Sequence, residues 1–222
     1  MIILGVDSSA TLASVAIAED EKTIVNINLN HKRTHSEKLL DMINQALRLA
    51  QLTINDIDVF MVNKGPGSFT GLRIGIATVK GLCHAVNKPA VPVSTLDSFY
   101  YSTSGYETVC PIMDARRGEV YAAVYHKGEK VMEDTPIALS ELLKKLDYEK
   151  ILFLGDGVPV HRELIEKELG NRAEFECEHN NFGSAAAVIK AGLNEIKKNG
   201  TVDYNNLNPV YLRVSQAERL KK

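Results

Sequence analysis

The sequence is poor in cysteine, and this excludes several kinds of site. Its three cysteines, Cys83, Cys110 and Cys177, are odd in number and lack the CxxC spacing of a zinc or thiol-redox site. Reduced thiols are therefore expected. No apolar run approaches membrane-spanning length, and the opening MIILGVDSS has no basic region of the kind that begins a signal peptide. We expect a cytoplasmic protein.

Clustered positive charge is also missing. Lys and Arg number 26 against 28 Asp and Glu, which gives a net charge of −2. A protein that grips nucleic acid alone is usually basic, with the charge gathered in a patch. RNA is therefore expected to be bound only through a larger complex. Direct binding of tRNA stays open because the C-terminus carries a small basic group, Arg213, Arg219, Lys221 and Lys222.

The most distinctive stretch present is Gly65 to Val86, GPGSFTGLRIGIATVKGLCHAV. Its glycines and proline end the preceding element, and Ser68 or Thr70 can cap the helix that follows. One stripe of that helix is apolar: Phe69, Leu72, Ile76, Val79, Cys83 and Val86. A second stripe is mostly small: Gly71, Gly75, Thr78, Leu82 and Ala85. A helix so apolar needs cover on two sides, one from its own sheet and one open to a second protein.

The first half of the chain reads as three strands and then alternating helices and strands. The expected strands are Ile2 to Val6, Ser14 to Ala18, Val25 to Leu29, Val59 to Val62 and Ala90 to Val93. The expected helices are one from the capping box Thr34 to Glu37 up to Leu52, the glycine-segment helix, and a short one from Leu96 to Tyr101.

The second half repeats this order. Val109 to Met113 ends at Asp114 as the first strand ends at Asp7, and the two hairpins align without a gap at a separation of 107. A strand near Val131, strands at Ile151 to Leu154 and Ala173 to Glu176, and helices at Leu139 to Leu146, from Pro159 to just before Gly170, and at Ser184 to Asn199 complete the repeat. The predicted domains are 1–104 and 105–222, and the tail 208–222 can return to the first.

Such a duplication, with an aspartate ending the first strand of each half, is typical of the sugar-kinase, Hsp70 and actin folds. The predicted class is therefore α/β, a duplicated actin-like (ASKHA, RNase H-like) fold with two mixed sheets, each β-β-β-α-β-α-β-α. In that superfamily the hairpin turns usually read Asp-x-Gly and grip nucleotide phosphates. Here they read Asp7-Ser8-Ser9 and Asp114-Ala115-Arg116, and a side chain at the glycine position hinders a close approach to phosphate.

These turns define a candidate vestigial nucleotide or anion site. Its residues are Asp7, Ser8, Asp114, Arg116, Arg117, Gly155 and Gly157. The alternative is structural: the aspartates accept backbone N–H bonds in their own turns, the arginines are solvated or touch a partner, and Gly155 to Gly157 is an ordinary turn.

Other patterns for catalysis or metal binding are weak. His31 and His35 have a metal-like spacing, but a helix start at Thr34 places them on different local structures, and solvated histidines are the alternative. Cys83 and His84 are adjacent on a helix and point about 100° apart, which disfavours a nucleophile and base. The glycine segment is neither a Walker loop nor a dinucleotide fingerprint. No catalytic residue, metal or cofactor is expected.

GPGSFTGLRIG at Gly65 to Gly75 resembles the signature of the TsaB (YeaZ) family. The opening ILGVDSS, the helix start HSE with two leucines, DARRGEVY and PVYLR resemble the same family, so the likeness covers the whole chain. The resemblance implies a non-catalytic subunit in tRNA threonylcarbamoyladenosine synthesis. It also implies a larger catalytic paralogue, TsaD, as partner, the ATPase TsaE in the same assembly, and a homodimer when the chain is alone.

The expected docking surface lies on the first two helices, because contiguous apolar surface rarely stays bare. Its residues are Met42, Leu49, Phe69, Leu72, Gly71, Gly75 and Ile76. The alternative is that the last helix or the tail covers them within this chain.

Two enzyme functions are kept as alternatives, a nucleotide-dependent enzyme of the same superfamily and a glycoprotease-like peptidase. The degenerate turns count against the first, and the missing Ser/His/Asp or metal constellation counts against the second.

Overall fold

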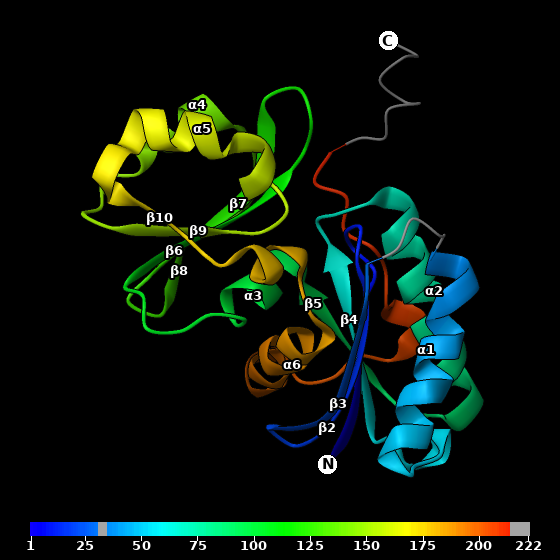
Figure 1. Cartoon of the computed structure of the whole chain (residues 1–222). Coiled ribbons are helices and arrows are strands. Elements are labelled where there is room, and N and C mark those ends of the chain that lie inside the picture. The colour runs from blue at the N-terminus through cyan, green and yellow to red at the C-terminus, as the bar shows by residue number, and fades with distance from the viewer. Residues whose placement is uncertain (31–34, 214–222) are drawn as a thin grey trace. The chain divides into compact units, whose positions relative to one another are not determined.

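The computed structural model describes residues 1–30 and 35–213 of the chain. Contacts divide these residues into two compact units. The first unit holds Met1–Ser102 and Gly183–Val210, and the second holds Thr103–Phe182 together with Tyr211 to Arg213. Figure 1 shows the helices and strands that make up each unit.

The first unit is a mixed sheet with helices on both faces. Its strands are β1 (Ile2–Asp7), β2 (Ala13–Glu19), β3 (Lys22–Leu29), β4 (Val59–Gly65) and β5 (Ala90–Ser94). Its helices are α1 (His35–Ala50), α2 (Phe69–Val86), α3 (Thr95–Tyr100) and α6 (Ala185–Asn199). The strand order is β3-β2-β1-β4-β5, in which β1 pairs with β2 antiparallel and with β4 parallel.

The continuous apolar run of β1 reflects burial on both faces of this sheet. Leu4 and Val6 join a core with residues of α1 and α2, which lie side by side (Figure 1). Ile3 joins a separate core with Val188 and Ile189 of α6 on the opposite face. The strands that lie between α1 and α2 on one face and α6 on the other are therefore shielded from water on both sides.

The second unit repeats the architecture. Its strands are β6 (Thr108–Asp114), β7 (Glu119–His126), β8 (Glu129–Ala138), β9 (Ile151–Leu154) and β10 (Ala173–Phe175), and its helices are α4 (Leu139–Lys145) and α5 (Val158–Leu169). The strand order β10-β9-β6-β7-β8 is that of the first sheet, with β6 in the place of β1. Leu142 and Leu143 of α4 and Ile165 of α5 share a core with Ile112 and Phe153 of the sheet.

The predicted element order, three strands and then helix, strand, helix, strand, helix, is confirmed in both halves. The gapless alignment of the hairpins is wrong by one residue. Asp7 pairs with Ser14, but Asp114 pairs with Val120 rather than Tyr121, because the second hairpin has the shorter connection. The apolar pattern does not detect this shift, because Val120 and Tyr121 both continue the apolar run of β7.

The structure also divides the chain differently from the expected domains 1–104 and 105–222. The first crossing, between Ser102 and Thr103, lies close to the expected one, but α6 packs on β1, β2 and β5 of the first unit. The tail follows it there as far as Val210, whose N–H donates to the Lys64 carbonyl at 2.7 Å. No helix in the described ranges 1–30 and 35–213 is both long and apolar enough to cross a membrane.

Candidate functional site

The turn after β1 is closed by its own hydrogen bonds. Asp7 is buried, and its Oδ1 accepts the Ser9 N–H at 2.9 Å and the Ser9 hydroxyl at 2.6 Å. An aspartate in this role stabilises a turn by replacing a backbone acceptor. The Ser9 N–H is therefore bonded within the turn, whereas in a loop that binds phosphate such an N–H would point at the ligand.

The glycine segment packs directly against this turn. The Ser68 N–H donates to the Ser9 carbonyl at 2.6 Å, and the Ser8 hydroxyl donates to the Gly71 carbonyl at 2.8 Å. A Cβ on Gly71 would lie 2.0 Å from the Ser8 carbonyl oxygen, and one on Gly75 would lie 2.3 Å from the Ser8 hydroxyl. Of the two candidate caps of α2, Ser68 is used, since its hydroxyl accepts the Gly71 N–H.

This packing corrects part of the expected docking surface. Gly71 and Gly75 admit a backbone closely, as predicted, but the backbone is that of the chain's own Ser8 turn. Leu72 and Ile76 are buried in the first unit as well, and Ile76 belongs to the core of α1 and α2. Met42 is only 4% exposed and packs in the same core, because the buried stripe of α1 is wide.

Two of the predicted docking residues do face solvent. Leu49 on α1 is 63% exposed, and Phe69 at the start of α2 is 39% exposed. The Arg73 guanidinium carbon lies 3.8 Å from the centre of the Phe69 ring, a cation–π contact. Leu40 on α1, which sequence reasoning missed, is also exposed, at 53%. Leu40 lies outside the buried stripe of α1, and an apolar residue at such a position could have been recognised in the sequence as exposed.

The second unit builds its turn in the same way. Asp114 Oδ1 accepts the Arg116 N–H at 2.9 Å, and the Gly157 N–H donates to the Ile112 carbonyl at 3.1 Å. A Cβ on Gly155, whose φ is +106°, would lie 2.2 Å from the Ile112 carbonyl oxygen. Gly155 to Gly157 therefore packs against the end of β6 as the glycine segment packs against the end of β1.

The predicted anion-site residues Asp114, Arg116, Gly155 and Gly157 thus gather where the inner strands β6 and β9 end, and Arg117 is exposed in the same turn. Two further side chains join them that the sequence did not assign to this site. His161 of α5 lies 3.2 Å from Asp114 Oδ1, and Arg213 pairs with Glu119 and donates to the Ala115 carbonyl at 2.6 Å. Asp7 and Ser8 belong to the first unit. A binding role for either set stays a prediction.

The side chains of Cys83 and His84 lie on different sides of α2. Cys83 is buried, and burial raises the pKa of its thiol to about 12. His84 is exposed, and its Nδ1 lies 2.9 Å from the Tyr204 hydroxyl. The two side chains therefore do not form a nucleophile and base. Of the histidine pair considered for a metal, His31 lies outside the described residues, and His35 begins α1.

The three thiols give a direct test of this arrangement. Burial raises the pKa of Cys110 as well as that of Cys83, whereas Cys177 is exposed. The thiolate is the reactive form of cysteine. We therefore expect only Cys177 to react promptly with Ellman's reagent in the native protein at about pH 8. All three thiols should react after unfolding in guanidinium chloride. Prompt reaction of two or three thiols in the native protein would contradict the burial of the other two.

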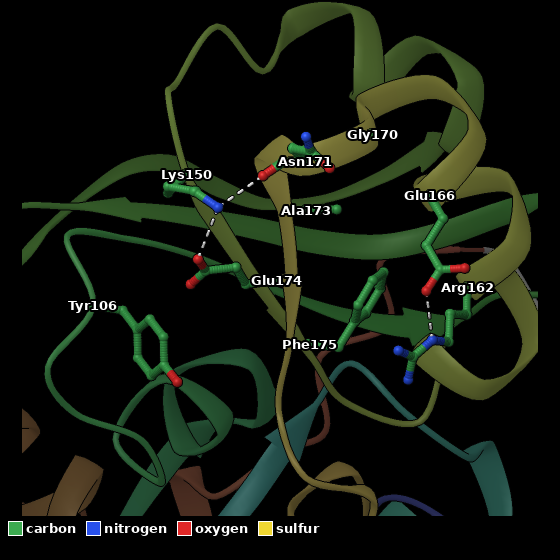
Figure 2. Close-up of a pocket in the computed structure, with 9 residues that line it drawn as sticks. All are labelled: Tyr106, Lys150, Arg162, Glu166, Gly170, Asn171, Ala173, Glu174 and Phe175. Atoms are coloured by element: carbon green, nitrogen blue, oxygen red, sulfur yellow. Dashed lines mark hydrogen bonds and ion pairs between the residues drawn. The ribbon is translucent and has the colours of Figure 1, made fainter.

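An open groove lies in the second unit, beside the outer strand β10. Its volume is about 870 Å³. We call it the β10 groove, and its main side chains, shown in Figure 2, are Tyr106, Lys150, Arg162, Glu166, Glu174 and Phe175. The sequence analysis did not single out any of them, because they come from separate segments with no recognisable motif.

Comparison with known proteins places the chain in a family. The model of the family described as "TsaD: tRNA N6-adenosine threonylcarbamoyltransferase" matches residues 22–220. The tRNA threonylcarbamoyladenosine biosynthesis protein TsaB of Bacillus subtilis is 31% identical over 98% of this chain and 96% of its own length. This chain belongs to the TsaB (YeaZ) family. The resemblance of its glycine segment to the TsaB signature is thereby confirmed.

Solved structures confirm the expected fold. YeaZ from Pseudomonas aeruginosa superimposes with a TM-score of 0.78 at 24% identity, covering 95% of this chain and 99% of that one. An inorganic polyphosphate/ATP-glucomannokinase from Arthrobacter sp. strain KM superimposes with a TM-score of 0.52 at 9% identity, over 89% and 99% of the chains. The TsaB (YeaZ) chain therefore has the duplicated actin-like fold shared with sugar kinases.

Proposed function

We propose that this chain acts in the synthesis of threonylcarbamoyladenosine in tRNA as a non-catalytic subunit that binds and activates TsaD. Membership of the TsaB family and the names of its relatives support the pathway. In this proposal a TsaE-like ATPase joins the assembly, tRNA is reached only through the complex, and the chain forms a homodimer when TsaD is absent.

The observation that carries the non-catalytic role is the closure of both hairpin turns. Ser9 N–H and Arg116 N–H are held by the aspartates of their own turns, and neither turn has a glycine two residues after its aspartate, where a side chain hinders a close approach to phosphate. The loops that follow β4 and β9 then pack on the turns with their glycines. These contacts favour a rigid scaffold over a phosphate-gripping site.

Docking through α1 and α2 is supported by Leu49 and Phe69, two large apolar side chains left in solvent on neighbouring helices. Such side chains gain free energy when a partner buries them, and aromatic residues often dominate an interface. Arg73 holds the Phe69 ring in place through the cation–π contact, which reduces the entropy lost on binding.

The test is reconstitution of threonylcarbamoyl transfer by TsaD with and without this chain, using a double variant, Leu49→Asp with Phe69→Asp. We expect the variant to bind TsaD at least about 30-fold more weakly, roughly 2 kcal/mol, and to lose its stimulation at concentrations where the wild type saturates. Affinity is measured by calorimetry and transfer by incorporation of labelled threonine into tRNA.

Val160→Asp is the matched control, because Val160 is similarly exposed, at 62%, but lies on α5 of the second unit. Wild-type affinity and stimulation are expected for it. Full transfer by TsaD without this chain would overturn the proposed activation. Unchanged binding by the double variant would overturn the docking surface, and hydrolysis of ATP or of a peptide by the isolated chain would overturn the non-catalytic role.

A further inference from the structure

The outer strand β10 leaves part of its backbone on a free edge. Among the strands of the described residues 1–30 and 35–213, it pairs only with β9, in parallel, with Phe175 opposite Phe153. The Glu176 N–H donates to the Phe153 carbonyl at 3.1 Å. Backbone groups of successive strand residues point in opposite directions within the sheet, so the N–H and carbonyl of Phe175 point away from β9. Unpaired edge groups of this kind are a template for another strand.

The β10 groove lies over this edge and has side chains on both sides of it. Figure 2 shows Glu174 on the side of Tyr106 and Lys150, and Phe175 on the side of Arg162 and Glu166. The Arg162 guanidinium stacks over the Phe175 ring at 4.4 Å. Tyr106, 43% exposed, supplies an aromatic ring on the opposite side. A segment laid along β10 would therefore find one ring on each side for its alternating side chains.

The charges of the groove cancel in pairs. Lys150 lies 3.2 Å from Glu174, and Arg162 lies 2.8 Å from Glu166. Lys150 also donates to the Asn171 carbonyl at 2.8 Å, which fixes its position. A polyanion such as RNA binds where several cations are left uncompensated, and these two already have carboxylate partners. A net-neutral peptide suits the groove better.

We propose that the free edge of β10 binds an extended, net-neutral peptide segment of a partner protein, which adds a sixth strand to the second sheet. The main chain of the segment pairs with the N–H and carbonyl of Phe175, and its side chains rest alternately on Tyr106 and on the Arg162–Phe175 stack. This is strand addition, in which backbone bonds supply affinity and flanking pockets supply selectivity. The inference is independent of the docking surface on α1 and α2, because all of its residues belong to the second unit.

The probe is a phage-displayed library of linear seven-residue peptides, selected on the intact protein. An enriched peptide is then made with a fluorescein label, and its affinity is measured by fluorescence polarisation against a scrambled control. We compare Phe175→Ala, which removes the ring but keeps the N–H, with Phe175→Pro, which removes both. Proline is tolerated on an edge strand when the lost N–H faces outward.

We expect Phe175→Ala to weaken binding about tenfold and Phe175→Pro to weaken it by a further factor of about five, since one backbone bond is worth about 1 kcal/mol. Should Phe175→Pro fail to fold, hydrogen exchange of the Phe175 amide in the wild type serves instead, with at least tenfold slowing expected on saturation with peptide. Equal affinity of the two variants, or unchanged exchange, overturns strand addition.

The remaining outcomes also decide against the proposal. If the library yields no peptide that outcompetes its scrambled control, the groove does not bind extended peptides. If a tRNA transcript binds and Phe175→Pro removes that binding, the occupant is RNA. If the protein self-associates through β10 and Phe175→Pro makes it monomeric, the occupant is a second copy of this chain.

Discussion

Replacing Gly71 by alanine is expected to lower the free energy of unfolding by about 3 kcal/mol or more. The added Cβ would lie 2.0 Å from the Ser8 carbonyl oxygen, far inside van der Waals contact. Neither side can move easily, because the Ser8 hydroxyl is bonded to the Gly71 carbonyl and the Ser68 N–H to the Ser9 carbonyl. Urea denaturation followed by circular dichroism measures the loss.

Gly81→Ala is the matched control in the same helix. Gly81 is exposed, and nothing lies within 4 Å of the position its Cβ would take. Alanine there should stabilise the protein by about 0.5 to 1 kcal/mol, because glycine is a poor helix former. If the two substitutions changed stability by the same amount, helix propensity rather than contact with the turn would govern this end of α2.

Gly155→Ala is expected to cost the second unit about 3 kcal/mol, from two sources that add. The φ of +106° is a conformation that alanine rarely adopts, and the Cβ would lie 2.2 Å from the Ile112 carbonyl oxygen. Amide exchange in β6 and β9 should accelerate together with the fall in the urea midpoint, because Gly155 joins the ends of these two strands.

Gly128→Ala separates the two sources. Gly128 has a φ of +86° in the turn between β7 and β8, and its Cβ would meet nothing within 4 Å. It should cost only the backbone strain, about 1 to 2 kcal/mol. A Gly155→Ala variant no less stable than Gly128→Ala would contradict the packing of Gly155 against β6.

The duplicated fold could be predicted from the sequence because its signals are local. Buried strands such as Ile151 to Leu154 are short apolar runs, and the long helices α2 and α6 show both an apolar period and a serine cap, Ser68 and Ser184. The destination of α6 could not be predicted in the same way. Its apolar face requires a sheet to cover, but the pattern does not say which of the two sheets that is.

The docking residues show the same limit at the scale of side chains. Met42 and Leu49 are one heptad apart and read as one face of α1, yet Met42 lies in the core and Leu49 in solvent. The buried residues of α1 end at Leu47, and the sequence period alone does not show that burial stops before Leu49. Likewise, small residues at Gly71 and Gly75 predict that a backbone comes close, but whose backbone it is follows only from the fold.

The passage of the chain from one unit to the other and back has a consequence for its synthesis. Residues 183–210, which complete the first unit, leave the ribosome after nearly all of the second unit has emerged. Until then the apolar face of the first sheet with Ile3, Met61 and Val91 lacks α6, the helix whose side chains pack on it. The unit that begins the protein is thus completed only after most of the other has been made, and a nascent chain stalled before residue 183 would expose this apolar surface to chaperones.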